Sequence, residues 1–147
     1  MVIAIIGENC AGKSTLAETI KTELGGEVIT GKDYLRMAKS ESEAEKLFRE
    51  KLKSAAEGDE DIIYVISEKA HIALLPDGAV RVLVYCDLGV IKERFRARMR
   101  GTLPPPVEKM LENKHGAFDG GDYEYRFDGG GEDAEAFAKK LSTEFKK

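Results

Sequence analysis

Near its start the chain carries a short loop that is bounded by glycines and ends in lysine and serine. Residues 7–14 read Gly-Glu-Asn-Cys-Ala-Gly-Lys-Ser. They directly follow the apolar run Val2–Ile6 and precede a helix-compatible stretch, Thr15–Leu24. A strand, a GxxxxGK[ST] loop and a helix in this order are typical of a phosphate-binding loop. The alternative is a chance spacing of glycines in an ordinary strand-turn-helix unit.

The chemistry of this loop follows from its backbone and its last two side chains. Glycines at both ends allow the backbone N–H groups to wrap around a polyphosphate, and the next helix directs the positive end of its dipole at the same anion. Lys13 is expected to contact the β- and γ-phosphates, and the hydroxyl of Ser14 to bind Mg²⁺. The predicted nucleotide-binding residues are Gly7, Glu8, Asn9, Cys10, Ala11, Gly12, Lys13, Ser14 and Thr15.

Two roles are open for Cys10 within this loop. Converging N–H groups and the helix dipole favour a reactive thiolate, which would make nucleotide binding sensitive to oxidation. The alternative is a small apolar side chain that packs beneath the loop.

The composition limits what this chain can form. At 147 residues and 42% hydrophobic content, it fits one domain, residues 1–147, with a single core. Its 23 basic and 27 acidic residues nearly balance, which gives no indication of a nucleic-acid partner. The run Val2–Ile6 is too short for a signal peptide or a membrane span. The two cysteines form no disulfide framework, so a reducing, cytoplasmic setting is expected.

Apolar runs alternate with helical patterns along the chain, which favours a parallel α/β sheet. The runs at 62–66 and 80–85 are almost continuously apolar, as expected of strands covered on both faces. The alternation Tyr-Glu-Tyr-Arg-Phe at 123–127 is typical of an edge strand. The predicted strands are Val2–Ile6, 27–29, 62–66, 80–85 and 123–127.

The spacing of apolar residues also predicts helices between these strands. Ser40 followed by Glu43 is a capping-box signal for the start of the second helix. Prolines at 104–106 and glycines at 120–121 indicate that residues 100–122 form a long functional loop with at most a short helix. The helix side chains expected to face inward are Leu16, Ile20, Leu24, Ala44, Leu47, Phe48, Leu52, Ala55, Ile91, Phe95, Met99, Ala134, Phe137, Ala138, Leu141 and Phe145.

Residues 30–36, just after the second predicted strand, read Thr-Gly-Lys-Asp-Tyr-Leu-Arg. This stretch resembles the S/T-x-G-[DE]-x-[FLY]-R motif of the nucleoside monophosphate kinases, adenylate and cytidylate kinases. By this resemblance Arg36 grips the phosphate of the acceptor, with Thr30 and Asp33 beside it. The match is imperfect, because the glycine stands one residue early and a lysine takes its place. Without the resemblance, Asp33 is an acidic residue at a helix N-terminus and Arg36 is a solvated side chain.

Glu68 follows the third predicted strand at its carboxyl end. A carboxylate beside the phosphate-binding loop can hold Mg²⁺ directly or through water, between the β- and γ-phosphates. The segment 66–82 resembles the cytidylate kinase pattern, in which this strand ends in Glu-Gly-Arg. Here the sequence is Glu68-Lys69-Ala70, so the arginine that accompanies cytidine specificity is missing. The alternative is an ordinary exposed glutamate at a strand end.

Arg94 and Arg98 lie four residues apart, each three residues after an apolar side chain that is expected to face inward. The spacing resembles the R-x-x-x-R at the start of the lid in these kinases. By this resemblance both arginines cover the nucleotide and neutralise the transferring phosphoryl group. The alternative is surface charge that matches the dipole at a helix C-terminus.

The resemblance implies a P-loop NTPase three-layer sandwich with a five-stranded parallel sheet in the order 2-3-1-4-5. It implies an acceptor-binding segment at about residues 30–58, a lid at about 94–122, and catalysis by Lys13, Arg94 and Arg98 with Mg²⁺. The expected function is transfer of a phosphoryl group from ATP to a small acceptor, a nucleoside monophosphate in the main interpretation. The alternatives are a kinase of the shikimate or gluconate type and a non-catalytic, ATP-binding regulatory module. The expected partners are ATP and the acceptor, without nucleic acid or membrane.

Overall fold

The computed structural model describes residues 1–145 and contains one parallel sheet of five strands. The strand order is β2-β3-β1-β4-β5, so the strand that leads into the phosphate-binding loop lies at the centre. This confirms the predicted fold class and strand order. The strands are β1 (Val2–Ile6), β2 (Glu27–Thr30), β3 (Ile62–Ile66), β4 (Val80–Tyr85) and β5 (Tyr125–Asp128).

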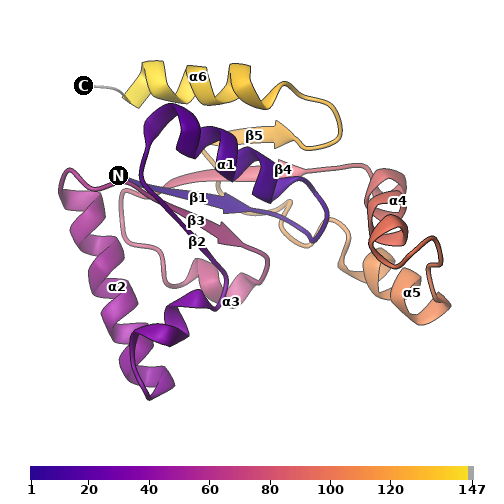
Figure 1. Ribbon diagram of the computed structural model, residues 1–147, viewed down its shortest axis with the longest axis horizontal. Helices are drawn as coiled ribbons and strands as arrows, with labels where there is room; N and C mark the ends of the chain where they lie inside the picture. Colours follow the sequence, from indigo (N-terminus) through magenta and orange to yellow (C-terminus); the bar gives the residue numbers. More distant parts are fainter. Residues whose placement is uncertain (146–147) are drawn as a thin grey trace.

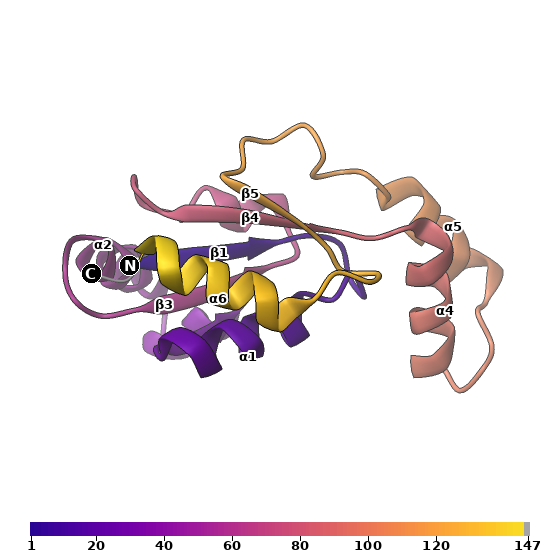
Figure 2. The ribbon, with the colours of Figure 1, turned by 90° about the horizontal axis from the view of Figure 1, so that it is seen from above.

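Helices cover both faces of this sheet and also lie beyond the carboxyl ends of its strands (Figure 1). Two helices lie together on one face, and a long helix, a short helix and a 3-10 turn lie on the other. A further pair stands beyond the carboxyl ends of the strands, as the view from above also shows (Figure 2). The pair on the first face is α1 (Lys13–Leu24) and α6 (Ala134–Phe145). The other face carries the long helix α2 (Glu41–Glu57), the short helix α3 (Lys69–Ile72) and the 3-10 turn η1 (Asp33–Met37). The pair beyond the carboxyl ends is α4 (Leu88–Arg98) and α5 (Pro105–Lys114).

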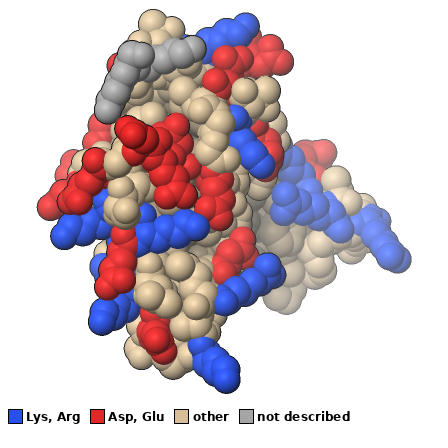
Figure 3. Space-filling view, turned by 60° about the vertical axis from the view of Figure 1, so that its left-hand side comes forward, with Lys and Arg blue, Asp and Glu red and all other residues tan. Residues whose placement is uncertain are grey.

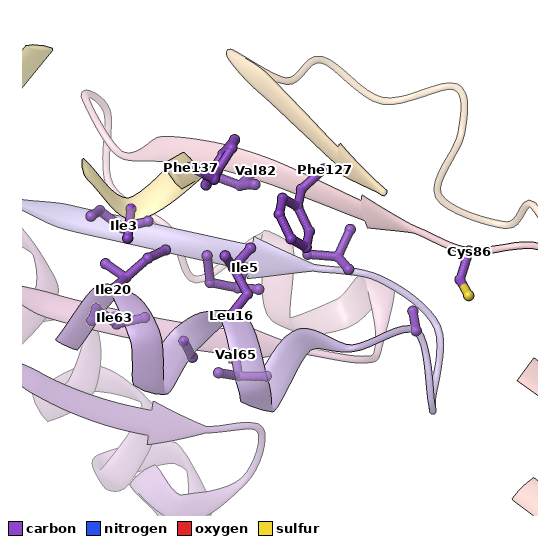
Figure 4. Close-up of a cluster of buried hydrophobic side chains, with 14 of the residues drawn as sticks. Ile3, Ile5, Leu16, Ile20, Ile63, Val65, Val82, Cys86, Phe127 and Phe137 are labelled. Carbon is purple, nitrogen blue, oxygen red and sulfur yellow. The ribbon is translucent and has the colours of Figure 1, made fainter. Parts of the chain in front are cut away.

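Both faces of the central strand are buried, which explains its uninterrupted apolar sequence. Ile3 and Ile5 belong to the core beneath α1 and α6, whereas the alternate residues of β1 belong to the core beneath α2. Figure 4 shows Leu16 and Ile20 of α1 directed at these two isoleucines. Because successive side chains of a strand point to opposite faces, β1 joins the two cores and holds the loop that follows it.

Aromatic side chains attach η1 and α2 to the second face of the sheet. The ring of Tyr34 in η1 stacks on Phe48 of α2 at a centroid distance of 5.0 Å, and Phe48 meets Tyr64 of β3 edge-on at 4.9 Å. The hydroxyl of Tyr64 donates to the carbonyl oxygen of Gly31 at 2.8 Å. The segment that follows β2 is therefore fixed to the sheet by its neighbours in space.

Two predicted inward-facing residues lie at the surface. Leu47 of α2 is 36% exposed, because the buried stripe of that helix runs through other positions, Phe48 among them. Met99 is 37% exposed and caps α4 without belonging to it. Ala134 and Phe145, at the two ends of α6, are only partly buried.

The predicted loop at 100–122 was the largest error in secondary structure. It contains α5, a ten-residue helix that begins at Pro105 and has proline at its first two positions. A proline is well suited to the first turn of a helix because that turn has no use for its missing N–H. The prolines therefore start a helix of ten residues, longer than the short helix that the prediction allowed within this loop. The edge strand β5 also begins two residues later than predicted, at Tyr125. Ser40, by contrast, caps α2 as predicted, since its hydroxyl accepts from the backbone N–H of Glu43 at 3.2 Å.

The two ends of the sheet differ in what lies beyond them. Both α4 and α5 stand beyond the carboxyl ends of the strands (Figures 1 and 2). Figure 3 brings forward the left-hand side of Figure 1, away from α4 and α5. On this face acidic and basic side chains lie close to one another. No helix among residues 1–145 is long and apolar enough to cross a membrane. Ligand binding is expected at the carboxyl ends, as in open parallel sheets generally.

Candidate functional site

The phosphate-binding loop leaves β1 between the carboxyl ends of its two neighbouring strands. The backbone N–H of Gly7 donates to the carbonyl oxygen of Ile66 in β3 at 3.1 Å, and a Cβ on Gly7 would overlap the carbonyl of Val84 in β4. Gly12 caps α1 with a φ of 108°, a left-handed conformation that favours glycine. No side chain caps this helix, so its first N–H groups are free to meet an anion.

A cavity of about 500 Å³ opens over this loop and the start of α1; we call it the loop cavity. It brings together residues from the loop, from the ends of β2 and β3, from α4 and from the β5–α6 connection. Of the nine predicted nucleotide-binding residues, Gly7, Glu8 and Ala11 are not in its lining. The lining residues are Asn9, Cys10, Gly12, Lys13, Ser14, Thr15, Leu16, Thr30, Val65, Ser67, Arg94, Arg98, Phe127, Gly129, Glu132 and Ala134.

Lys13 lies deep in the loop cavity, with 6% of its surface exposed. Its Nζ donates to the backbone carbonyl oxygen of Glu8 at 2.6 Å. Burial lowers the pKa of Lys13 to about 8; the neighbouring Cys10 and Glu8 act in the opposite direction, and Arg98 lowers the pKa further. An ammonium in such a poorly solvated place attracts an anion more strongly than one in water does.

Arg94 links the loop to the β5–α6 connection from the side. Its guanidinium donates to the carbonyl oxygen of Cys10 at 3.0 Å and to that of Gly129 at 2.7 Å. The backbones of the loop and of the β5–α6 connection approach closely, because a Cβ on Gly129 would overlap the carbonyl of Ala11. Arg98, one helical turn further along α4, is exposed and lines the same cavity. Arg94 therefore supports the loop, whereas the Arg98 side chain is available to a ligand.

Cys10 is 8% exposed and belongs to the core beneath α1. Its φ of 65° is one of two positive values among the non-glycine residues 1–145. Its carbonyl is turned toward Arg94. This environment favours the packing role over that of a freely reactive thiol.

The predicted acceptor residues are only partly brought together. Thr30 lines the loop cavity, and its backbone N–H donates to Asp33 Oδ2 at 3.2 Å. Arg36 is an exposed residue of η1 and is not among the residues that line this cavity. The roles of Thr30, Asp33 and Arg36 in acceptor binding stay predictions.

The Glu8 side chain turns away from the loop cavity. Its Oε1 lies 3.1 Å from His115 Nδ1, and its Oε2 accepts from the backbone N–H of Gly116 at 3.2 Å. These contacts join the phosphate-binding loop to the turn that follows α5. Nothing in the local sequence predicts them, because the partners lie more than 100 positions apart.

A second cavity, of about 280 Å³, lies beside the loop cavity; we call it the side cavity. Asn9 and Ser67 line both cavities. Glu68, the predicted metal ligand, lines the side cavity, and its Oε2 is 3.4 Å from His71 Nε2. The complete lining is Glu8, Asn9, Ser67, Glu68, Lys69, Met110, Leu111, Lys114, Ala117 and Phe118.

The residues present are compatible with Mg²⁺ bound together with a nucleotide. Residues 1–145 contain no group of three or more His, Cys, Asp or Glu side chains arranged to hold a metal on their own. Mg²⁺ in kinase sites keeps several waters and takes one or two protein ligands besides the phosphates, so such a group is not required. The exposed hydroxyl of Ser14 lines the loop cavity beside Lys13 and can supply one ligand.

The sequence analysis missed the contribution of the β5–α6 connection. Gly129, Glu132 and Ala134 line the loop cavity, and Gly129 accepts from Arg94. The signal that could have shown it is the run of three glycines at 129–131. A glycine run can equally mark a close approach of two backbones, as it does here.

No protein-family model and no curated protein sequence matches this chain. Solved structures do match over nearly its whole length. An uncharacterized protein from Eubacterium ventriosum aligns with a TM-score of 0.67 and 17% identity over 98% of this chain and 97% of its own. A gluconokinase from Sinorhizobium meliloti aligns with a TM-score of 0.62 and 16% identity over 97% of this chain and 94% of its own. Shikimate kinase from Acinetobacter baumannii aligns with a TM-score of 0.61 and 16% identity over 99% of this chain and 95% of its own.

At these identities the comparisons show the fold alone, and this chain shares it with proteins described as shikimate kinase and gluconokinase. They do not show the nucleoside monophosphate kinase subtype that the sequence motifs resemble. The fold and the phosphate-binding loop agree, whereas the acceptor has to be argued from this chain's own cavities.

Proposed function

We propose that this protein transfers the γ-phosphoryl group of ATP to a small non-nucleotide acceptor. The observation that carries the proposal is that two separate cavities share Asn9 and Ser67 in their linings at the phosphate-binding loop. Phosphoryl transfer needs a donor and an acceptor roughly in line across the transferred group. Two cavities that share lining residues beside the loop offer that arrangement.

The residues of the loop cavity have three roles: they bind the phosphates, neutralise charge on the transferring group and support the phosphate-binding loop. Lys13 and the N-terminus of α1 bind the phosphates, and Ser14 holds Mg²⁺, which neutralises charge on them when it is bound with the nucleotide. Arg98 neutralises charge on the transferring group, and Arg94 keeps the loop in shape. Glu68 stays a predicted ligand of Mg²⁺, directly or through water, since it adjoins Ser67.

The transfer itself requires no covalent bond to the protein. The acceptor hydroxyl oxygen forms a bond to the γ-phosphorus as the bond from that phosphorus to the bridging oxygen of ADP breaks. ADP leaves with the electron pair of that bond, and the hydroxyl proton passes to water. Positioning and charge neutralisation account for the rate in such a reaction.

Two observations favour a metabolite over a nucleoside monophosphate. The structural neighbours include proteins described as gluconokinase and shikimate kinase. In this chain Arg36, which the resemblance assigns to the acceptor phosphate, lines neither of the two cavities. Nucleoside monophosphates remain the second candidate because residues 30–36 resemble their motif.

An acceptor panel tests the proposal. The purified protein is incubated with Mg-ATP and, in turn, shikimate, gluconate, cytidine monophosphate and adenosine monophosphate, and the release of ADP is measured. We expect acceptor-dependent ADP release with a hydroxylated metabolite, and none from Lys13→Ala under the same conditions. ATP binding without ADP release for any acceptor in this and wider panels would favour the regulatory module instead.

A further inference from the structure

We infer that the side cavity binds the acceptor, and that the acceptor is a compact hydroxyl compound with an apolar face and one anionic group. The inference rests on the proposed function for its chemistry, and on the lining of the side cavity for its location. It assigns acceptor binding to α5 and the turn after it, a segment that the sequence resemblance places in a lid over the nucleotide.

One wall of the side cavity is apolar and held in place. Leu111 and Phe118 are 6% and 7% exposed, and Met110 and Ala117 complete the wall. The carbonyl oxygen of Phe118 accepts from the hydroxyl of Tyr123 at 2.5 Å, which fixes the turn that carries it. Small-molecule sites combine such an apolar lining with a few placed polar groups. The occupant therefore turns an apolar face to this wall.

The size of the side cavity limits the occupant. Its volume of about 280 Å³ is little more than half that of the loop cavity, at about 500 Å³. Pockets for drug-sized ligands begin at about 300 Å³. A ring with a few substituents suits this space better than a base, a sugar and a phosphate together.

The charges at the rim favour one anionic group. Lys69 and Lys114 are exposed there, and neither forms an ion pair within residues 1–145. Of the two carboxylates of the lining, Glu8 accepts from the backbone N–H of Gly116 and lies beside His115, and the exposed Glu68 has its Oε2 3.4 Å from His71 Nε2. The lining contains no arginine, the side chain best matched to a phosphate by its paired donors. Two unpaired ammonium groups instead suit a carboxylate.

The route from this cavity to the phosphates is short. Asn9 and Ser67 line both cavities. When the apolar face of the occupant packs against the apolar wall, a hydroxyl on its other side lies next to the loop cavity. The apolar wall and the rim lysines would thus set the orientation of the acceptor, and the hydroxyl would face the donor. Holding both reactants in this way is the main source of rate in phosphoryl transfer.

A binding experiment tests the assignment without turnover. The probes are 3-hydroxybenzoate, which has a flat apolar ring, a hydroxyl and a carboxylate, and 3-hydroxybenzamide, which differs by lacking the charge. Each is titrated into the ¹⁵N-labelled protein and the amide shifts are followed. We expect the acid to shift Ser67, Leu111 and Ala117 with an affinity at least about fivefold above that of the amide. Equal affinities, or shifts confined to the loop cavity, would overturn the inference.

Matched variants locate the site. Ala117→Phe fills the side cavity from an exposed position and should abolish binding of 3-hydroxybenzoate, whereas Ala136→Phe on the exposed side of α6 should leave it unchanged. Lys114→Ala should lower the affinity for the acid toward that for the amide. Lys109→Ala, an exposed lysine of the same helix outside the lining, is its control. Binding that survives Ala117→Phe would overturn the inference.

Failure of the inference and failure of the proposed function give different results. Acceptor-dependent ADP release that Ala117→Phe leaves unchanged would overturn the side cavity as acceptor site and leave the kinase intact. Specific binding of 3-hydroxybenzoate without turnover of any hydroxy acid would instead count against the proposed function. Tighter binding of cytidine monophosphate than of 3-hydroxybenzoate at the same amides would overturn the compact acceptor.

Discussion

The loop cavity and the side cavity adjoin each other, yet they are built in different ways. Seven consecutive positions, 9–15, supply six of the residues that line the loop cavity, and β1 and α1 hold these positions from both ends. The side cavity takes its lining from residues 8–9, 67–69 and 110–118, which meet only in the folded chain. A motif in the sequence can therefore describe the first cavity, whereas only the fold defines the second.

The difference extends to how each cavity is supported. The loop is held by strand neighbours and by Arg94, whose guanidinium bonds to two carbonyl oxygens. The side cavity depends on the Glu8 contacts with His115 and Gly116, which bring the turn after α5 against the loop. We expect substitutions in the loop cavity to affect ATP and every acceptor alike, and substitutions in the side cavity to affect the acceptor alone.

The largest effect is expected from Lys13→Met. Without the buried ammonium the loop cavity keeps its shape but loses its strongest attraction for the phosphates. Removing such an electrostatic group costs about 100-fold to 1,000-fold in kcat. ADP release is the measurement, and circular dichroism and thermal unfolding are the controls for the fold. ADP release within tenfold of wild type would separate Lys13 from catalysis.

Gly129→Ala tests the close approach between the loop and the β5–α6 connection. A Cβ at this position would overlap the carbonyl of Ala11, whereas one on Gly131 meets open space. Overpacking of this kind costs about 1–3 kcal/mol, so Gly129→Ala should lower the free energy of unfolding by about that amount and weaken ATP binding. Urea denaturation and ATP titration give both numbers. Equal stability and equal ATP affinity of Gly129→Ala and Gly131→Ala would show that the close approach at Gly129 supports neither.

Replacing the two arginines separates support from catalysis. Arg94→Ala leaves the carbonyl oxygens of Cys10 and Gly129 without their charged donor, which should cost about 2 kcal/mol in the free energy of unfolding. Arg98→Ala removes an exposed side chain and should leave the stability unchanged while kcat falls more than either KM rises. Denaturation curves and steady-state kinetics distinguish the two. Similar loss of stability in both variants would contradict this division.

The pKa of Lys13 predicts how ATP binding depends on pH. Because burial lowers this pKa to about 8, the ammonium is largely intact at pH 7 and largely neutral at pH 9. Phosphate binds to the protonated form, so the affinity for ATP should fall about tenfold as the pH rises from 7 to 9. Isothermal titration calorimetry in matched buffers measures it. Lys13→Met should show weak binding without this slope, and a slope that persisted would point to another group.

The smallest effects distinguish two sites for the acceptor. If the acceptor lies in the side cavity, Lys114→Ala should raise its KM about fivefold and leave the KM of ATP unchanged, whereas Arg36→Ala should change either value by less than about twofold. The sequence motif predicts the reverse, with Arg36 as the grip on the acceptor. Steady-state kinetics of the two variants, side by side with wild type, decides between the two arrangements.

Some of these features could be predicted from the sequence because they depend on neighbours along the chain. The apolar run of β1, the glycines of the loop and the start of α1 specify a strand, a turn and a helix locally, and the alternation of strands and helices then restricts the sheet to a parallel one. The cap at Ser40 was likewise readable, since its acceptor and donor lie three residues apart. Such interactions survive in almost any tertiary context.

The rest was decided by tertiary structure. The segment 100–122 forms a ten-residue helix and a turn that reaches the phosphate-binding loop, although its prolines and glycines had favoured a long loop with at most a short helix. Glu8 contacts His115, Arg94 donates to Gly129, and Glu68 lines the side cavity and not the loop cavity that contains Lys13. Each of these outcomes joins side chains to groups that the sequence leaves far away. Their energies depend on burial and on partners that only the folded chain brings into reach.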